Sequence, residues 1–243
     1  MDALMPTIHL SRKALERFTG KKMSDELVKE SITALGTGFE GIEGDVISVE
    51  VFPNRPDLLS EAGMGRALSA FLNVKPGLRT YAVRKSKYKV VVDKSVSKVR
   101  PCTSCAVVTG IHFDDGLIQE IIQMQEKLHV TFCRQRKKAG IGIYPLEKIA
   151  WPIRYEGRKP SDIKFMPLDA SREMTATQIL STLPTGQAYG HLLEGQERYP
   201  LFVDANGGIM SMPPIINSEA TGRVTTSTRE VFIECSGFDQ AVL

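Results

Sequence analysis

The sequence DANGGIMSMPPIINSEATGRVTTSTREVFIECSGFD, residues 204–239, carries the local signals around which the rest of the chain is organised. It connects two apolar runs, 200–203 and 231–233, through a segment rich in Gly, Pro, Ser and Thr, and each run ends on a carboxylate, Asp204 or Glu234. Apolar runs that are bounded by turn residues are typical of β-strands. We therefore expect both runs to be strands and to lie in one sheet.

Glu234 lies in a strand that is otherwise apolar. A carboxylate in such a place is costly to bury without a partner, so Glu234 is a candidate for binding a polar group of a ligand. Strand alternation places Ser236 on the same face. The alternative is a strand-end carboxylate that faces water or pairs with Arg223 or Arg229.

The segment Ser211-Met212-Pro213-Pro214 lies between the two runs. Consecutive prolines fix φ and remove two backbone donors, which predicts a rigid loop. Rigid loops at strand ends commonly hold binding groups.

The composition is that of an ordinary soluble globular protein, with 243 residues, 42% hydrophobic and 24% charged. A net charge of +3 does not by itself indicate nucleic acid binding. No apolar run approaches the roughly 18–20 residues of a membrane helix, and the start of the chain lacks the apolar stretch of a signal peptide. We expect a cytoplasmic protein with no membrane partner.

Periodicity and turn residues predict an N-terminal module, residues 1–84, and a second domain, residues 85–243, joined by a Lys-rich linker near 75–89. The expected helices are 11–18, 25–35, 61–72, 115–130 and 175–181, and the expected strands include 7–10, 46–51, 88–92 and 105–113. The apolar face of helix 115–130 is predicted to be core.

Arg55 and Asp57 precede the helix 61–72 and have no His, Cys or metal-ligand neighbour in sequence. A latch that fixes the helix entry is therefore favoured over catalysis. Gly63 and Gly65 weaken that helix by about 1 kcal/mol each relative to Ala, which indicates close packing against another backbone.

A basic run follows helix 115–130 and contains Arg134, Arg136, Lys137 and Lys138. These cations either favour the helix dipole or neutralise phosphates, and phosphate contacts are the main sequence-independent source of nucleic acid affinity. His191 lies in a Gly-rich segment that interrupts the predicted secondary structure, and it is a further candidate for contact with RNA. The alternative is that His191 is exposed and has no functional role.

Cys102, Cys105, His129 and Cys133 imitate the spacing of zinc ligands. The favoured interpretation is that these cysteines are small buried hydrophobic residues and that the chain holds no metal.

The chain resembles the β subunit of phenylalanyl-tRNA synthetase of the archaeal and eukaryotic type, over nearly its whole length. The segments that carry the resemblance are MPTIHLSRKAL (5–15), FPNRPDLLSEAGMGRAL (52–68), IQMQEKLHVTFCRQRKKAGIGIYPLEKI (122–149), RKPSDIKFMPLD (158–169), SMPPIINSE (211–219) and FIECSGFD (232–239). The resemblance implies an α+β fold: a small N-terminal α/β module and then an editing domain with a mixed, largely antiparallel sheet and flanking helices. It also implies that further parts of the subunit follow, so we expect a fragment.

The resemblance implies a phenylalanine-tRNA ligase with (αβ)₂ assembly, in which the α subunit holds the aminoacylation site. The β subunit would edit, by hydrolysing tyrosine mistakenly attached to phenylalanine tRNA. ATP and Mg²⁺ would serve the full enzyme, and no cofactor is expected in this region.

By resemblance, Glu234 is assigned to the tyrosine hydroxyl. Ser211 and Pro213, in the proline loop, are expected to contact the aminoacyl ester or the sugar, and Asn217 and Ser236 to orient the attacking water. Because an aminoacyl ester is already activated, positioning a water can suffice without a covalent nucleophile. The alternative function is a noncatalytic tRNA-binding or scaffolding fragment.

Overall fold

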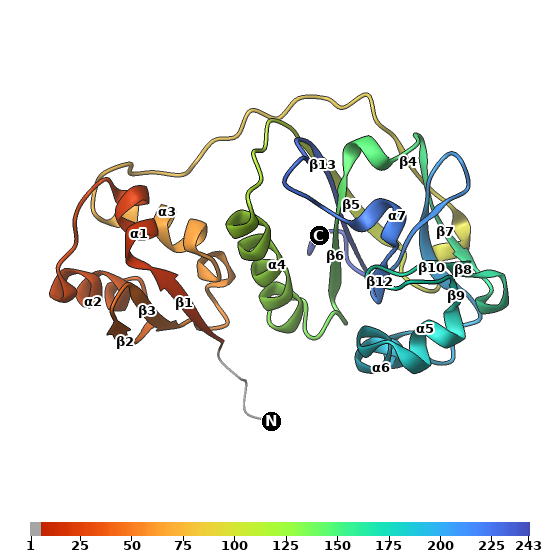
Figure 1. Cartoon of the computed structure of the whole chain (residues 1–243), viewed down its shortest axis with the longest axis horizontal. Helices are drawn as coiled ribbons and strands as arrows, with labels where there is room; N and C mark the ends of the chain where they lie inside the picture. Colours follow the sequence, from red (N-terminus) through yellow and green to blue (C-terminus); the bar gives the residue numbers. More distant parts are fainter. Residues whose placement is uncertain (1–5) are drawn as a thin grey trace. The chain divides into compact units, whose positions relative to one another are not determined.

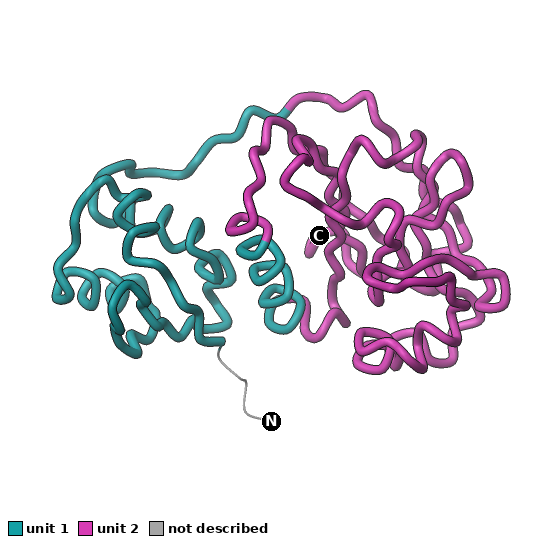
Figure 2. Tube along the Cα trace, in the orientation of Figure 1, with its two compact units in different colours: residues 1–83, 119–132 teal, residues 84–118, 133–243 magenta. Residues whose placement is uncertain are grey.

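The computed structural model describes residues 6–243 and divides the chain into two compact units (Figures 1 and 2). The first unit consists of the described residues up to Val83 together with Gln119–Phe132, and the second of Arg84–Ile118 and Cys133–Leu243. The predicted division at residues 84 and 85 omits the segment 119–132, whose Leu128 packs against the core of the first unit.

The first unit is built on a three-stranded antiparallel sheet in the order β1-β3-β2. Its elements in chain order are β1 (Thr7–Ser11), α1 (Arg12–Thr19), α2 (Asp25–Ala34), β2 (Gly38–Glu43), β3 (Val46–Glu50), the 3₁₀ turn η1 (Pro56–Leu58) and α3 (Glu61–Phe71). Helix α4 (Asp115–Val130) adds its residues from Gln119 onward. The buried side chains of these elements form one apolar cluster.

Local signals in the sequence fix the helix ends in this unit. The side chains of Ser11 and Ser24 accept hydrogen bonds from the third residue of the helix that follows each of them. Such caps satisfy backbone donors that the first helical turn leaves unpaired. Gly20 ends α1 with φ of 65°, a left-handed conformation that glycine adopts without steric cost. The predicted boundaries of these two helices agree with the structure to within one residue at each end.

The predicted latch before α3 is also confirmed. Arg55 donates to both carboxylate oxygens of Asp57 at 3.0 Å and to the carbonyl of Leu35 at 2.5 Å. A Cβ at Gly63 would lie 2.0 Å from the Asp57 carbonyl oxygen, so only glycine permits this backbone approach. Gly65 differs from the prediction, because a Cβ there would lie 2.4 Å from a ring carbon of Phe18, a side chain rather than a backbone.

Helix α4 has the predicted limits but not the predicted burial. Only His129 among its residues is buried, whereas Ile122 is 54% exposed and Val130 is 41% exposed. The prediction that its whole apolar face is core is therefore wrong. Periodicity identifies an amphipathic helix, but it does not say how much of the apolar face another element covers.

The second unit contains most of the strands. Its elements are β4 (Val90–Val92), η2 (Lys94–Val96), β5 (Cys102–Val108), β6 (Ala139–Pro145), η3 (Leu146–Lys148), β7 (Ile153–Arg158), η4 (Pro160–Asp162), β8 (Lys164–Phe165), β9 (Met174–Thr175), α5 (Ala176–Thr182), α6 (Pro184–Tyr189), η5 (Gly190–Leu192), β10 (Tyr199–Val203), β11 (Ile209–Met212), β12 (Ile216–Asn217), α7 (Glu219–Gly222) and β13 (Val231–Gly237). The strand expected at 105–113 thus runs from Cys102 to Val108, and the one expected at 88–92 begins at Val90.

Two larger sheets organise this unit. One has the order β12-β11-β10-β7-β4, with β4 parallel to β7 and the other pairs antiparallel, and the other is the antiparallel sheet β5-β13-β6. The mixed, largely antiparallel architecture predicted for this part is confirmed. The prediction that the runs 200–203 and 231–233 share a sheet is wrong, because β10 and β13 pair with different strands.

Apolar side chains from both sheets of the second unit share a core. Tyr155 stacks on Phe202 with ring centroids 4.5 Å apart, and Phe232 of β13 packs edge-on against Trp151 at 5.3 Å. This aromatic packing joins β7 and β10 to β13, so the two runs expected in one sheet lie in neighbouring sheets of one core.

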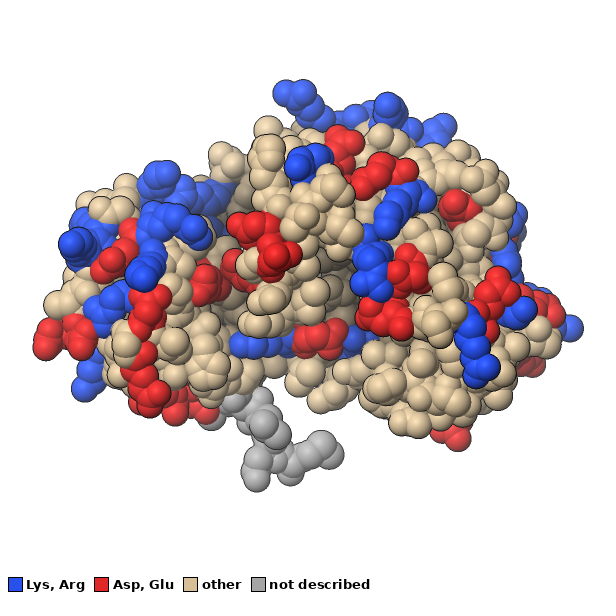
Figure 3. Space-filling model, in the orientation of Figure 1, with Lys and Arg blue, Asp and Glu red and all other residues tan. Residues whose placement is uncertain are grey.

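Charged side chains of both signs are interspersed over the face shown in Figure 3, in keeping with the small net charge of +3. Within residues 6–243, helices long and apolar enough to cross a membrane are absent.

Candidate active site

Glu234 lies in the middle of β13, the central strand of the β5-β13-β6 sheet, opposite Cys105 and Gly142. It is 3% exposed, although it carries a carboxyl group. Arg223 pairs with Asp169 and Glu219, and Arg229 donates to backbone carbonyls. The alternative of a water-facing carboxylate, or one paired with either arginine, is therefore wrong.

The Glu234 carboxyl group belongs to a short hydrogen-bond chain. Tyr144 Oη lies 3.2 Å from Glu234 Oε1 and 3.1 Å from Asn217 Oδ1. Among the described residues, Glu234 Oε2 is buried and has no hydrogen-bond partner. A buried polar atom in this state costs free energy, which makes it a candidate ligand contact.

Burial raises the pKa of Glu234 to about 8, although the charge of Arg100 and hydrogen bonds with Tyr144 and Ser236 act in the opposite direction. At neutral pH the group is therefore mostly protonated. Tyr144 Oη donates to Glu234 Oε1 and to Asn217 Oδ1, so its single hydrogen is shared between these two acceptors. Glu234 Oε2 takes no part in these hydrogen bonds.

Gly142 of β6 makes the room for this chain. A Cβ there would lie 2.4 Å from Tyr144 Oη and 2.6 Å from Glu234 Oε1. Both distances are well below van der Waals contact, so any larger residue would displace the phenol or the carboxyl group.

Ser211 comes to the same place from β11, in the other sheet. It is 1% exposed, pairs with Asn217 across the β11–β12 ladder, and its Oγ has no hydrogen-bond partner among the described residues. Its hydroxyl nevertheless lowers the pKa of Tyr144, a phenol that burial holds well above its ordinary pKa. The hydroxyl is thus close to the phenol without hydrogen-bond geometry.

The predicted proline loop closes the β11–β12 connection. Pro213 and Pro214 are buried, the bond between them is cis, and Ile215 N donates to Met212 O at 2.8 Å. Ser211, Pro213 and Asn217 therefore belong to one tight connection next to the hydrogen-bond chain.

Ser236 shares the buried face of β13 with Glu234, as strand alternation predicted, and is 0% exposed. Its Oγ accepts from Arg100 Nε at 3.1 Å, and its carbonyl accepts from the same guanidinium at 2.6 Å. Arg100 is itself only 3% exposed. Because Ser236 is held by this arginine, it is less available to a water than Ser211.

The basic run after α4 forms a left-handed turn. Arg134, Gln135 and Arg136 have φ of 50°, 56° and 60°. Each such residue other than glycine costs about 1–2 kcal/mol, so the turn persists because other contacts hold it. Lys137 N donates to Arg134 O at 3.1 Å, and Lys138 N donates to Cys133 O at 2.9 Å.

The cations grouped in the sequence are separated in space. Arg134 and Lys137 are exposed, Lys138 is half-buried, and Arg136 is 8% exposed. Arg136 donates to the carbonyls of Pro214 and Ile215 rather than facing solvent. His191 is exposed in η5.

The geometry does not assemble the zinc-like spacing. Cys102 and Cys105 lie three residues apart in β5, so their side chains point to opposite faces of the sheet. His129 lies 3.2 Å from Glu126. Across residues 6–243, no group of three or more His, Cys, Asp or Glu side chains is placed to hold a metal ion.

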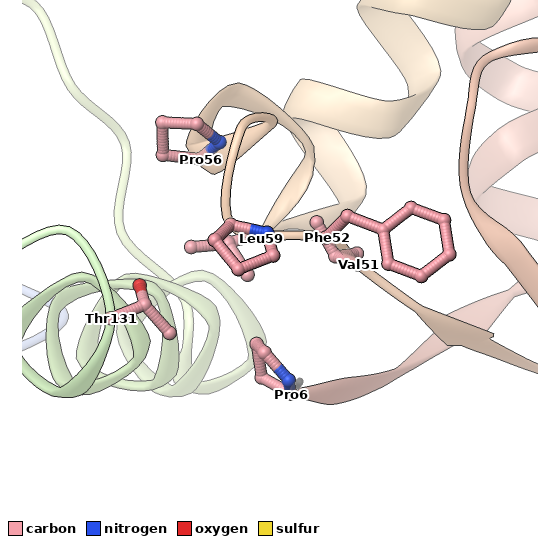
Figure 4. Close-up of a pocket in the computed structure, with 7 residues that line it drawn as sticks. Pro6, Val51, Phe52, Pro56, Leu59 and Thr131 are labelled. Atoms are coloured by element: carbon pink, nitrogen blue, oxygen red, sulfur yellow. The ribbon is translucent and has the colours of Figure 1, made fainter. Parts of the chain in front are cut away.

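A small pocket in the first unit supplies no comparable chemistry (Figure 4). It is lined by Pro6, Val51, Phe52, Pro53, Pro56, Leu59 and Thr131. This lining offers a hydroxyl but no acid or base, so the candidate active site is the cluster around Glu234.

Sequence reasoning missed Arg100, Tyr144 and Gly142. Each contacts the site through pairing of β6 with β13 or through a loop far away in the sequence. The signal that was available is the alternation of small residues in Gly140-Ile141-Gly142, since glycine inside a strand often marks a close approach.

Relatives of known sequence and a solved structure cover 98% of the chain. No family model matches it. The chain is 42% identical to the phenylalanine–tRNA ligase β subunit of Archaeoglobus fulgidus and 41% identical to that of Methanothrix thermoacetophila, over 98% of its length in both cases. It spans 43% and 44% of the lengths of these relatives.

The solved structure of an N-terminal fragment of the phenylalanyl-tRNA synthetase β subunit from Pyrococcus horikoshii is also similar. It superposes with a TM-score of 0.91 at 37% identity, covering 98% of this chain and 70% of that one. The chain therefore belongs to the family of phenylalanyl-tRNA synthetase β subunits and corresponds to the N-terminal region of that subunit.

Proposed function

We propose that this chain proofreads, by hydrolysing tyrosine that has been attached to phenylalanine tRNA. An apolar pocket for phenylalanine rejects tyrosine by only about 10²-fold, because an added hydroxyl on an isosteric ring costs little there. A second site that requires the hydroxyl can supply the missing discrimination.

The observation that carries the proposal is the buried Glu234 Oε2, which has no partner among the described residues. A tyrosine hydroxyl would donate to this acceptor. A phenylalanine ring would leave it buried and unpaired, and a site of this kind rejects a substrate that lacks the hydroxyl. Glu234 is thus assigned to tyrosine recognition.

Hydrolysis would need a positioned water. Ser211 Oγ is buried beside the phenol of Tyr144 and has its hydrogen-bonding capacity unused within the described chain, so it is the first choice for orienting the water or the ester. Asn217 accepts a hydrogen bond from the same phenol and would help to orient the water. Ser236 accepts a hydrogen bond from Arg100 and would influence the water through that arginine. Pro213 shapes the loop against the substrate. An activated ester requires no covalent nucleophile in this scheme.

The parent enzyme would supply the rest of the reaction. An α subunit in an (αβ)₂ assembly would charge phenylalanine tRNA with ATP and Mg²⁺, and mischarged tyrosine would then reach this site. Arg134 and Lys137 are exposed and would contact tRNA phosphates, with Lys138 and His191 nearby in the proposed interface.

The second candidate function is tRNA binding without hydrolysis. It is favoured by the exposed cations of the 134–138 turn, which would neutralise phosphates whether or not the Glu234 cluster turns over a substrate.

The test is release of labelled tyrosine and phenylalanine from the corresponding charged phenylalanine tRNAs. We expect selective release of tyrosine, and a loss of 100-fold or more in that rate for Glu234→Ala, because the buried contact exists for tyrosine alone. Cys235→Ala is the matched control, since Cys235 faces the other side of β13 and should keep the wild-type rate.

Tyrosine release by Glu234→Ala at the wild-type rate and selectivity would refute the recognition role. Binding of tRNA without release of either amino acid would support the noncatalytic function. Acyl-enzyme trapped on Ser211 would replace the water mechanism with a covalent one.

A further inference from the structure

Two halves of the proposed site come from separate sheets: Ser211 and Asn217 from β11–β12, and Glu234 and Ser236 from β13. We propose that Arg136 is a positioning residue that holds the β11–β12 loop against β13, and that it is not a phosphate ligand. This inference rests on the proposed function for its kinetic consequence, but the contacts that carry it are independent of the reaction.

The side chain of Arg136 holds the loop. Its Nη1 donates to the carbonyls of Pro214 and Ile215, each at 3.0 Å, directly after the Ser211–Pro213 segment. Its guanidinium carbon lies 4.2 Å from the ring centroid of Tyr189, at the end of α6. The face of the planar guanidinium packs on the Tyr189 ring, and its edge donates the hydrogen bonds to the two carbonyls. A lysine ammonium is not planar and cannot make both kinds of contact in this way.

The backbone of Arg136 reaches the strand. Its carbonyl accepts from Arg100 Nη2 at 3.3 Å, and the same nitrogen donates to Ser236 O at 2.6 Å. Arg100 therefore links the turn to β13, while the Arg136 side chain links it to the proline loop. The two arginines connect the halves of the site through buried hydrogen bonds.

Strand β6, which pairs with β13, has a glycine where the proline loop packs against it. Gly140 of β6 pairs with Ser236, and a Cβ at Gly140 would lie 3.2 Å from Pro214 Cβ. The proline loop therefore rests on the bare backbone of β6, beside the strand that carries Glu234.

The left-handed turn explains why Arg136 lies among the other cations of the run in the sequence but differs from them in burial. Three consecutive residues with positive φ send the Arg136 side chain inward, while Arg134 and Lys137 stay exposed. The turn thus combines an inner side that positions the site with an exposed outer side that can meet phosphates. Substitutions on the two sides should affect different kinetic constants.

The experiment compares Arg136→Lys with the double variant Arg134→Ala, Lys137→Ala in the full 243-residue chain. Single-turnover tyrosine release is measured against enzyme concentration, and tRNA binding against salt. We expect Arg136→Lys to lower the maximal rate at least tenfold, with half-saturation and salt slope within twofold of wild type. The double variant should keep the maximal rate, require a higher enzyme concentration for half-saturation, and lower the salt slope by about 1.4–1.8, at roughly 0.7–0.9 for each of the two lost phosphate contacts.

Chemical rescue sharpens the assignment. Added methylguanidinium should restore part of the maximal rate to Arg136→Ala and leave the maximal rate of the double variant unchanged. An Arg136→Ala variant with an unchanged maximal rate and a reduced salt slope would overturn the proposal, because loss of a cation that contacts a phosphate reduces the salt slope without changing the maximal rate.

Hydrogen exchange separates this inference from the proposed function. We expect at least tenfold faster exchange of backbone amides in residues 209–218 of Arg136→Lys, even if the wild-type chain releases no tyrosine. Should Arg136→Lys fail to fold, Tyr189→Leu removes the ring beneath the guanidinium and should accelerate the same amides to a smaller degree. Exchange in this segment at the wild-type rate would refute the positioning role.

Discussion

The two units each contain a three-stranded antiparallel sheet, and their central strands bury very different side chains. In the first unit, β3 buries Ile47 and Val49, both 0% exposed, in an apolar cluster. In the second unit, the corresponding face of β13 begins with Phe232 at 1% exposure but continues with Glu234 and Ser236 at 3% and 0%. The buried face of β3 consists of apolar side chains that pack in a core, whereas the buried face of β13 includes two polar side chains that form hydrogen bonds.

The difference shows what a sheet of this size requires for folding. Apolar side chains on the buried face are sufficient in β3, because burial of each contributes about 1.5–3 kcal/mol. A carboxyl group at the equivalent place in β13 reduces stability unless every polar atom finds a partner, and Glu234 Oε2 has none within residues 6–243. We infer that Glu234 serves binding at the expense of stability.

The largest expected effect is on the pH dependence of stability. The pKa of Glu234 is about 8 in the folded chain and about 4.5 when unfolded. Between these values the unfolded state binds fewer protons than the folded state, so stability falls as pH rises. At about 1.4 kcal/mol per pH unit, the wild type should lose about 4 kcal/mol between pH 5 and pH 8 relative to Glu234→Gln.

Urea unfolding of both proteins, followed by the fluorescence of Trp151, measures this difference. The chain has a single tryptophan, and it packs against Phe232 of β13, so its signal reports on the second unit. Parallel stability curves for the two proteins from pH 5 to pH 8 would mean that the carboxyl group is not buried as described.

A somewhat smaller effect is expected at β3. Ile47→Ala leaves a cavity in the apolar cluster and should lower the free energy of unfolding of the first unit by about 3 kcal/mol. Val46→Ala is the matched control, because Val46 is in the same strand and 46% exposed. Native-state hydrogen exchange of β3 amides reports the change, and equal effects of the two variants would contradict the assigned face.

The smallest of the three effects is expected at Gly142. Gly142→Ala would place a Cβ 2.6 Å from Glu234 Oε1 and should cost about 2 kcal/mol, together with most of the tyrosine release. Gly140→Ala in the same strand meets Pro214 at 3.2 Å and should be less destabilising. Trp151 fluorescence in urea and the release assay give both readouts, and a reversed order would show that the space beside Glu234 is not needed.

The sequence predicted the features that depend on neighbouring residues. Ser11 and Ser24 cap helices through donors within three residues, and the Arg55–Asp57 latch closes across two. The place of Glu234 within a strand and the side shared with Ser236 likewise follow from alternation.

The remaining features depend on pairings that a single sequence does not display. Tyr144 and Glu234 meet across ninety residues, and Arg100 and Ser236 across 136. Arg136 was grouped with its neighbouring cations because composition conceals the left-handed turn that sends it inward. The separate sheets of β10 and β13 were missed since similar apolar runs do not specify their partners.

The recognition role of Glu234 is tested most directly by competition between tyrosyl and phenylalanyl forms of phenylalanine tRNA in one reaction, with wild type and Glu234→Leu, which removes the buried acceptor but keeps most of the side-chain volume. We expect wild type to release tyrosine in preference to phenylalanine by at least 100-fold, and Glu234→Leu to lose most of this preference while remaining folded. An unchanged ratio in the folded Glu234→Leu variant would mean that the buried carboxyl group of β13 is not kept for recognition.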